Sequence, residues 1–439
     1  MGNMRLGAGL LALALFAAAC GTSDETPALE PSTTADPGTH TEEFTAGEEI
    51  SLDTPRAAPA VSDADIAAVV AGDTAFGLDL LRTTAGDENL MLSPYSIATA
   101  LSMLYPGARG PTATEIGDVL HLSVDDATLH AVRNHIDTSL ATPPDASADG
   151  DPFTVRPANS AWGQGGYPFR DEYLAVLAEH YGTGLRLLDY AGDPDGSRSV
   201  INDWVKDATE DRIKDLIPQG AITTDTRLTL VNAIWFKASW IVPFDPELTD
   251  QSTFTLLDGT EIEVPLMHSS VRTGYADADQ FQAIRLPYAG DAAMVVLLPK
   301  SGSPADLAAA LDPEDLDIVW RDHQVQVTLP SFAFEAELGL KSALQTLGMR
   351  TAFEAPVDGG ADLTAITSIR ELFVSDAFHK TFISLDEEGT EAAAATALVV
   401  GLTSLPSLAT FTADRPFLFW IEQSSTGEIL FLGQVTNPA

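Results

Sequence analysis

Cysteine and basic residues are scarce in this chain. Cys20 is the only cysteine, so the protein has no internal disulfide, no thiol nucleophile in a folded domain and no cysteine-based metal site. Lysine and arginine together number 23 against 64 aspartates and glutamates, which gives a formal net charge of −41 at pH 7. So few basic side chains argue against binding to nucleic acid, heparin-like polymers or anionic membrane surfaces, because those partners need basic patches.

The acidic composition has two explanations. A surface rich in aspartate and poor in lysine suits a protein that works at high salt. Alternatively, the source organism has acidic proteins in general, and the charge carries no such meaning. Both hypotheses predict a highly soluble protein.

Catalytic motifs are missing as well. The chain has no Gly-x-Ser-x-Gly nucleophile elbow and no His-Glu-x-x-His zinc motif. His121, His130 and His135 are close in sequence, but their spacing does not place all three on one helical face. We therefore predict that the protein is not an enzyme, and that it binds no metal ion and no cofactor.

Length and composition divide the chain into three parts. Residues 1–20 contain Arg5 and an apolar run at 6–19 that is too short to span a membrane, which is typical of an export signal. Residues 21–62 are rich in Thr, Pro, Asp, Glu and Ala, and predict a disordered acidic tether. Residues 63–439 carry the apolar patterns of one folded domain.

The end of the export signal allows two kinds of processing. The residues Ala17-Ala18-Ala19-Cys20-Gly21 are similar to a bacterial lipobox, in which the cysteine is lipidated and becomes the new N-terminus. The alternative is plain Ala-x-Ala cleavage beside an incidental cysteine. Lipidation of Cys20 predicts an exported protein anchored at the cell surface or on the periplasmic face of a membrane, whereas plain cleavage predicts an extracellular protein.

Helical patterns dominate the first half of the folded part, and strand patterns dominate the second. Ser93-Pro94 suits the start of a helix, because serine caps the first turn and proline fits within it. Strands and helices do not alternate regularly, so we predict an α+β fold rather than a doubly wound one. Helices are expected at 66–81, 94–104, 113–120, 170–181, 197–214 and 338–347, and strands at 228–236, 293–298, 325–330, 372–376, 381–385 and 428–435.

The segment 385–396 is compatible with two conformations. Its four consecutive alanines favour a helix, whereas Gly389 and the following Leu-Val-Val at 398–400 favour a strand. In a strand, one face would carry only small or apolar side chains, and Glu391 would lie on the other. Such a strand could enter the middle of an existing sheet, from which proline and bulky polar residues are excluded.

Several motifs in a fixed order resemble those of one protein family. They lie at 89–97, 107–116, 158–163, 201–205, 213–218, 230–240, 286–288, 385–396, 415–419 and 429–433. Through these motifs, which extend over about residues 65–438, the chain resembles the serpins, a family of serine protease inhibitors. The resemblance implies a serpin fold: α+β, with three β-sheets, a helical cluster and an exposed reactive-centre loop.

The resemblance also implies a function. A serine protease would cleave the exposed loop and form an acyl-enzyme, and the loop would then enter the main sheet with the protease still attached. The protein would thus be an irreversible suicide-substrate inhibitor, a monomer whose partner is its covalently trapped protease. The hinge that starts the loop comprises Glu387, Glu388, Gly389, Thr390, Glu391, Ala392, Ala393, Ala394, Ala395 and Thr396. The alternative is a non-inhibitory serpin, a binding or folding-helper protein at the cell surface, but such members are expected to have bulky, charged or proline residues in this hinge.

The usual family spacing from the hinge places the bait at Thr403, with cleavage before Ser404. The loop contains no lysine or arginine, so a trypsin-like target is disfavoured. Threonine suits the small pocket of an elastase-like or subtilisin-like protease. The stretch from Thr403 to Pro416 is slightly long, so Leu402 or Leu405 is the alternative bait, which would shift the preference toward chymotrypsin-like or broad subtilisin-like enzymes.

Polar residues under the main sheet are also implied by the resemblance. Ser93, Ser96, Asn232 and His379 correspond to the "shutter", where His379 can link the Asn232 amide to serine hydroxyls. Trp240 corresponds to the "breach", the point where insertion starts. In the family, the glutamate equivalent to Glu387 often pairs with a lysine after Leu-Pro, but here Leu329-Pro330 precedes Ser331, so that ion pair is absent.

Overall fold

The computed structural model describes residues 39–40, 44–141, 154–357, 359–390 and 408–439. The export signal with Cys20, most of the tether, the hinge from Glu391 onward and the bait candidates Leu402, Thr403, Ser404 and Leu405 lie outside these residues. Within the described residues, no helix combines the length and the apolar character that crossing a membrane requires.

A seven-stranded sheet, the main sheet, contains the longest run of buried strand residues. Its central strand β7 (Leu228–Ser239) is buried along almost its whole length, as expected of a strand covered on both faces. Its strand order is β13 (Phe332–Gly339), β14 (Val374–Leu385), β15 (Gly389–Thr390), β7, β4 (Thr154–Gln164), β6 (Leu185–Leu188) and β2 (Glu49–Ile50).

A nine-stranded sheet is held together by β9 (Glu261–Asp277), which is long enough to pair with three strands along its length. One section comprises β8 (Asp250–Thr255), β9, β12 (Arg321–Pro330) and β16 (Leu408–Thr412). The other comprises β10 (Phe281–Pro287), β11 (Ala292–Pro299), β17 (Phe417–Gln423), β18 (Ile429–Val435) and β3 (Leu90–Leu92). These two sections and the main sheet account for the three expected sheets, and β1 (Thr39–His40) with β5 (Phe169–Arg170) forms a separate pair.

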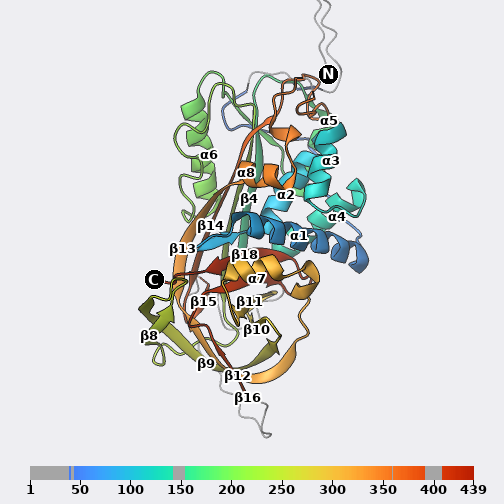
Figure 1. The fold of residues 1–439 in the computed structure, drawn as a ribbon. Helices are drawn as coiled ribbons and strands as arrows, with labels where there is room; N and C mark the ends of the chain where they lie inside the picture. Colours follow the sequence, from blue (N-terminus) through green and yellow to red (C-terminus); the bar gives the residue numbers. More distant parts are fainter. Residues whose placement is uncertain (1–38, 41–43, 142–153, 358, 391–407) are drawn as a thin grey trace, which may run out of the picture. The chain divides into compact units, whose positions relative to one another are not determined.

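The helices cover the two faces of the main sheet. Figure 1 shows α1 to α5 on one side of the long strands β4 and β14, and α6 on the other. The side chain of Ser93 caps α2 by accepting from the backbone N–H of Ser96, with Pro94 in the first turn, as the sequence predicts. The helices are α1 (Asp63–Thr84), α2 (Pro94–Leu104), α3 (Gly110–Val119), α4 (Asp126–Ala141), α5 (Asp171–Val176), α6 (Pro194–Ala208), α7 (Pro304–Ala310) and α8 (Leu340–Leu347).

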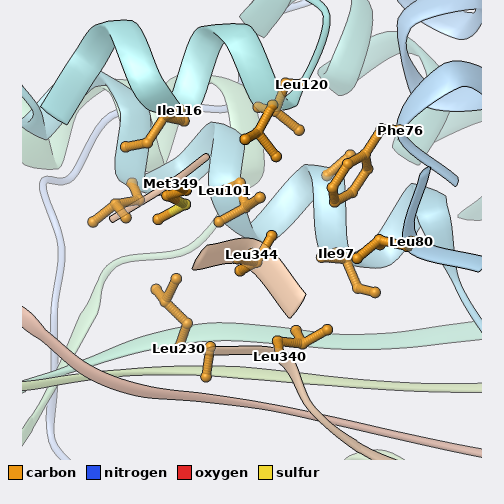
Figure 2. Close-up of a cluster of buried hydrophobic side chains, with 14 of the residues drawn as sticks. Phe76, Leu80, Ile97, Leu101, Ile116, Leu120, Leu230, Leu340, Leu344 and Met349 are labelled. Carbon is orange, nitrogen blue, oxygen red and sulfur yellow. The ribbon is translucent and has the colours of Figure 1, made fainter. Parts of the chain in front are cut away.

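Alternate residues of β7 serve two different cores. Leu230 packs with the helices, and Figure 2 shows it facing Leu340 and Leu344 of α8. Val231, on the opposite face, packs with α6 and the segment that follows it. Successive side chains of a strand point to opposite faces, so β7 packs against other elements on both faces of the main sheet.

Two expected elements have different limits in the structure. The helix predicted at 197–214 is α6, which ends at Ala208, and Glu210, Asp211 and Asp215 have positive φ angles that no helix allows. The strands predicted at 372–376 and 381–385 form one strand, β14, because the residues between them, 377–380, pair with β7, and 378–380 pair with β13 as well.

Residues 44–62, predicted as part of the tether, are packed against the domain, and we call them the N-terminal strap. Within the strap, β2 extends the main sheet at β6, and Glu49 forms an ion pair with Arg186 at 2.5 Å. The Arg56 guanidinium forms an ion pair with Asp137 of α4 at 2.6 Å. Side-chain contacts of this kind between distant parts of a chain are not visible in composition, which explains the wrong boundary.

Candidate functional site

The start of the hinge is already a strand of the main sheet. β7 and β14 pair in parallel from Leu228 and Val374 up to Ile234 and Thr381. Beyond that point β15 lies between them, and Thr390 pairs with Leu385 on one side and Ala238 on the other. The Thr390 side chain is 1% exposed, so its environment is that of a sheet interior.

A tight turn at 386–389 reverses the chain into β15. The Asp386 carboxylate accepts hydrogen bonds from the backbone N–H groups of Glu388 at 2.9 Å and Gly389 at 3.2 Å. Half-burial of Asp386 raises the pKa of its carboxyl, although these two hydrogen bonds act in the opposite direction. Gly389 has φ +152°, and a Cβ there would lie 2.2 Å from the carbonyl oxygen of Ala238. Only glycine therefore allows the hinge to approach β7 this closely.

Aromatic residues cover the point where β15 enters. The rings of Trp240 and Tyr288 are stacked, with centroids 4.3 Å apart and planes 8° from parallel. Trp240 Nε1 donates to the carbonyl oxygen of Asp386 at 3.1 Å. The buried hydroxyl of Tyr288 lies 2.8 Å from Thr390 Oγ1. The sequence points to Trp240 at this position, but the contact of Tyr288 with the hinge depends on tertiary structure and was missed.

Glu387 is held at the base of the hinge without a lysine partner among the described residues. Its carboxylate accepts from Thr249 Oγ1 at 2.7 Å, and its carbonyl oxygen accepts from the backbone N–H of Phe244 at 2.8 Å. The position that a lysine occupies in related sequences is Ser331, whose backbone N–H donates to the carbonyl oxygen of Pro265. The neutral hydroxyl of Thr249 thus takes the place of the lysine as the partner of Glu387. A hydrogen bond to a neutral group is less sensitive to salt than an ion pair.

The structure brings Ser93, Ser96, Asn232 and His379 together beneath the main sheet. Asn232 on β7 lies opposite His379 on β14, and the two side chains are hydrogen-bonded through His379 Nδ1 and Asn232 Oδ1. On the other side, Asn232 Nδ2 donates to Ser96 Oγ at 2.7 Å. Any strand that enters between β7 and β14 at this level must break the bond between His379 and Asn232.

The predicted contact between His379 and a serine hydroxyl is wrong in detail. His379 Nε2 accepts from the backbone N–H of Ser93 at 3.0 Å, while the hydroxyl of Ser93 caps α2. The sequence also missed Asn159 on β4, whose Oδ1 accepts from Asn232 Nδ2 at 2.8 Å and from Ser96 Oγ at 2.7 Å. Asn159 lies opposite Asn232 in the register of β4 and β7, so only strand pairing reveals it.

Burial sets the protonation state of this network. It lowers the pKa of His379 to about 3, so the ring is neutral at physiological pH. Because Nε2 accepts from an N–H group, the ring proton lies on Nδ1 and is donated to Asn232. This arrangement satisfies both ring nitrogens without a charge inside the sheet.

The arrangement at the hinge is suited to accepting a strand, because β15 already lies between β7 and β14. Within the described residues there is no group of three or more His, Cys, Asp or Glu side chains that could hold a metal ion. The side chains of Ser96, Asn159, Asn232 and His379 are hydrogen-bonded to one another beneath the main sheet.

Comparisons with known proteins agree with this architecture. Residues 71–438 match the family model described as "Serpin (serine protease inhibitor)". An uncharacterized serpin-like protein of Thermococcus kodakarensis is 38% identical over 380 residues, which cover 84% of this chain and 86% of the relative. The human leukocyte elastase inhibitor is 33% identical over 386 residues, covering 83% and 98%.

Solved structures give the same result for the fold. The native state of tengpin, a thermophilic serpin, superposes with a TM-score of 0.78 at 25% identity and covers 90% of this chain and 100% of its own. Human thyroxine-binding globulin, solved with its hormone, has a TM-score of 0.75 at 27% identity, covering 85% and 100%.

Proposed function

This chain belongs to the serpin family, which is described as a family of serine protease inhibitors. Its structural neighbours also include a hormone-binding protein, thyroxine-binding globulin. We propose that this chain is one of the inhibitors, an irreversible suicide-substrate inhibitor of serine proteases. One observation carries the proposal: residues 389–390 already form strand β15 between β7 and β14. The residues that follow offer one uncharged face of small side chains, so the hinge can continue as a strand through the sheet.

The proposed reaction uses the catalytic groups of the target protease. Its serine oxygen attacks the bait carbonyl, the peptide bond after the bait breaks, and the new amine leaves with a proton. The hinge side of the loop, now free at its acyl end, extends β15 toward Leu228. Residues 390–403 would span roughly 45 Å as a strand at about 3.3 Å per residue, which carries the acylated protease along the sheet.

Three contacts of this chain must change as the strand advances. The bond between His379 and Asn232 opens, the parallel pairing of β7 with β14 is replaced, and the packing of α6 on Val231 is displaced. Each loss is offset by hydrogen bonds of the new strand to both neighbours.

The bait proposed from sequence spacing is Thr403, with Ser404 after the cleaved bond, and Leu402 or Leu405 is the alternative. A small or aliphatic bait residue suits elastase-like and subtilisin-like proteases. The similarity to an inhibitor named for leukocyte elastase supports the same class of target.

Covalent trapping is the direct test of this function. Incubating the purified domain with a panel of serine proteases is expected to give, for an elastase-like or subtilisin-like member, a band at the summed mass that survives denaturing electrophoresis. Mass spectrometry of the released fragment should show a chain that begins at Ser404; a start at Thr403 would assign the bait to Leu402, and a start at Pro406 would assign it to Leu405. If every protease only degrades or ignores the domain, the inhibitor proposal is wrong and a non-inhibitory binding function is favoured.

We also propose that Cys20 is lipidated and anchors the exported protein at a cell surface or on the periplasmic face of a membrane. The apolar run, the small residues before Cys20 and its status as the lone cysteine support this. Cys20→Ala is expected to shift the protein from the membrane fraction to the soluble fraction or to leave it unprocessed. Unchanged fractionation, together with an N-terminal peptide that carries no lipid, would exclude the anchor.

A further inference from the structure

Three charged side chains are buried away from the hinge, where α1, α4 and the start of β18 meet. Asp73 of α1 and Arg133 of α4 are each 1% exposed, and Glu428, directly before β18, is 0% exposed. Charged residues are almost never buried this completely unless they are paired. Nothing in the proposed inhibitory reaction uses them.

The pairing within this cluster is unequal. Arg133 donates through both terminal nitrogens to the two carboxylate oxygens of Asp73, one of them at 2.6 Å, and through Nε to Ser102 Oγ at 3.2 Å. Arg133 thus neutralises Asp73. Among the described residues, no N–H or O–H group donates to either carboxyl oxygen of Glu428, although both oxygens are buried.

Glu428 lacks a positive charge of its own, because Arg133 already neutralises Asp73. Two carboxylates facing one guanidinium would leave one uncompensated negative charge in a site without solvent, which is strongly unfavourable. A proton on Glu428 removes that charge and provides a donor for Asp73. Burial and the neighbouring Asp73 both raise the pKa of Glu428, while Arg133 acts in the opposite direction.

We propose that Glu428 holds a proton in the folded protein and shares it with Asp73, so that the carboxyl pair and Arg133 form a proton-dependent clasp between α1, α4 and β18. Alkaline pH removes the proton and weakens the clasp. Arg133 also donates to Ser102 of α2, the helix that Ser93 caps and that contains Ser96, so the clasp supports the helix beneath the main sheet.

The other titratable groups near Glu428 do not explain a loss of stability between pH 7 and 9. Tyr95 of α2 is buried and donates to Asp137 at 3.0 Å, and burial raises its pKa above the ordinary 10. Tyr181, beside Arg133, has a pKa raised by burial. His130 on α4 is neutral, because burial lowers its pKa to about 4.

The direction of the pH effect follows from proton counting. A folded-state pKa above the unfolded value of 4.5 means that the folded protein binds more protons, so stability falls as pH rises through the pKa of Glu428. His130 and His379 act in the opposite direction, but only below their ordinary value of 6.5. Tyrosines titrate near 10 and above. The pKa of the half-buried Asp386 is also raised, but its carboxylate accepts two backbone hydrogen bonds that oppose the shift. Between pH 7 and 9, we therefore assign the decline to the fully buried Glu428, and Glu428→Gln separates the two groups.

The test is equilibrium unfolding in urea from pH 6.5 to 9 at constant salt. In the wild type, the unfolding constant is expected to rise by up to about tenfold per pH unit until the pKa of Glu428 is reached. Glu428→Gln keeps the shape and a donor without the titration, so its profile should be flat. In Asp73→Asn, Glu428 can ionise against Arg133, and the profile should flatten as well. The matched control is Glu261→Gln at an exposed strand position, which should keep the wild-type slope.

A second measurement detects the proton directly. The infrared spectrum of the wild type at pH 7 should contain the C=O band of a protonated carboxyl that is absent from Glu428→Gln and present in Glu261→Gln. A wild-type profile that is flat from pH 7 to 9 overturns the proposal, even if the variants do not fold. A decline that persists in Glu428→Gln, or a missing carboxyl band, also overturns it. None of these outcomes depends on protease trapping.

Discussion

Replacing Thr390 by arginine is expected to abolish protease trapping while cleavage of the loop continues. Thr390 is buried in the main sheet with its hydroxyl against that of Tyr288, and among the described residues no acidic side chain forms a hydrogen bond with it. An unpaired charge at this position costs on the order of several kcal/mol, and a barrier about 3 kcal/mol higher slows insertion roughly 100-fold. The acyl-enzyme would then hydrolyse before the strand advances. Denaturing gels should show cut inhibitor and free protease in place of the covalent band.

The same substitution on an exposed strand provides the control. Thr253 on β8 is exposed beside Glu263, and Thr253→Arg adds the same charge outside the main sheet. It is expected to leave the ratio of complex to cut inhibitor unchanged. If the Thr390→Arg variant still traps the protease fully, loop insertion into the main sheet does not start at β15.

Cutting the loop of the wild-type protein is expected to raise its Tm by roughly 20 °C or more. A strand of about a dozen residues between β7 and β14 forms hydrogen bonds on both sides, each with a net contribution of about 1 kcal/mol, which gives a gain on the order of 10 kcal/mol. For a domain of this size, 1 kcal/mol corresponds to about 2 °C in Tm. Thermal unfolding before and after limited proteolysis within the loop measures the change.

The variant Thr390→Arg separates cleavage from insertion in this experiment. It is cut at the same bond, but its hinge is not expected to enter the sheet, so the rise in Tm should be much smaller. An equal rise in both proteins would show that the gain comes from something other than insertion past Thr390. An unchanged Tm in the cut wild type would contradict the proposed mechanism.

The sequence predicted the parts of the fold that depend on local pattern. The apolar stripe and the Ser93 cap predicted α2. Within the segment 385–396, the predicted strand is present at Gly389–Thr390, and the residues after Thr390 lie outside the described part of the chain. Contacts set by strand register were not predictable. Asn159 joins the polar network because it lies opposite Asn232 across β4 and β7, and a single sequence does not contain that register.

Contacts between residues far apart in the chain were also not predictable. Asp73 and Arg133 are 60 positions apart, and Glu428 comes from the other end of the domain. Each of these residues has an ordinary sequence context for an exposed side chain. The N-terminal strap was missed for the same reason, since Arg56 reaches Asp137 only in the folded protein.

The N-terminal strap joins the domain at the end of the main sheet away from the hinge. Phe44 packs on Gly165, just after β4, and at this end of the sheet Gly163 of β4 is paired with Leu228 of β7. In Figure 1, α5 marks this end at the top, and the label β15 marks the hinge lower in the view. A strand that extends β15 runs from Ser239 toward Leu228. In the proposed reaction, the acylated protease is therefore carried toward the end of the main sheet where the N-terminal strap joins the domain.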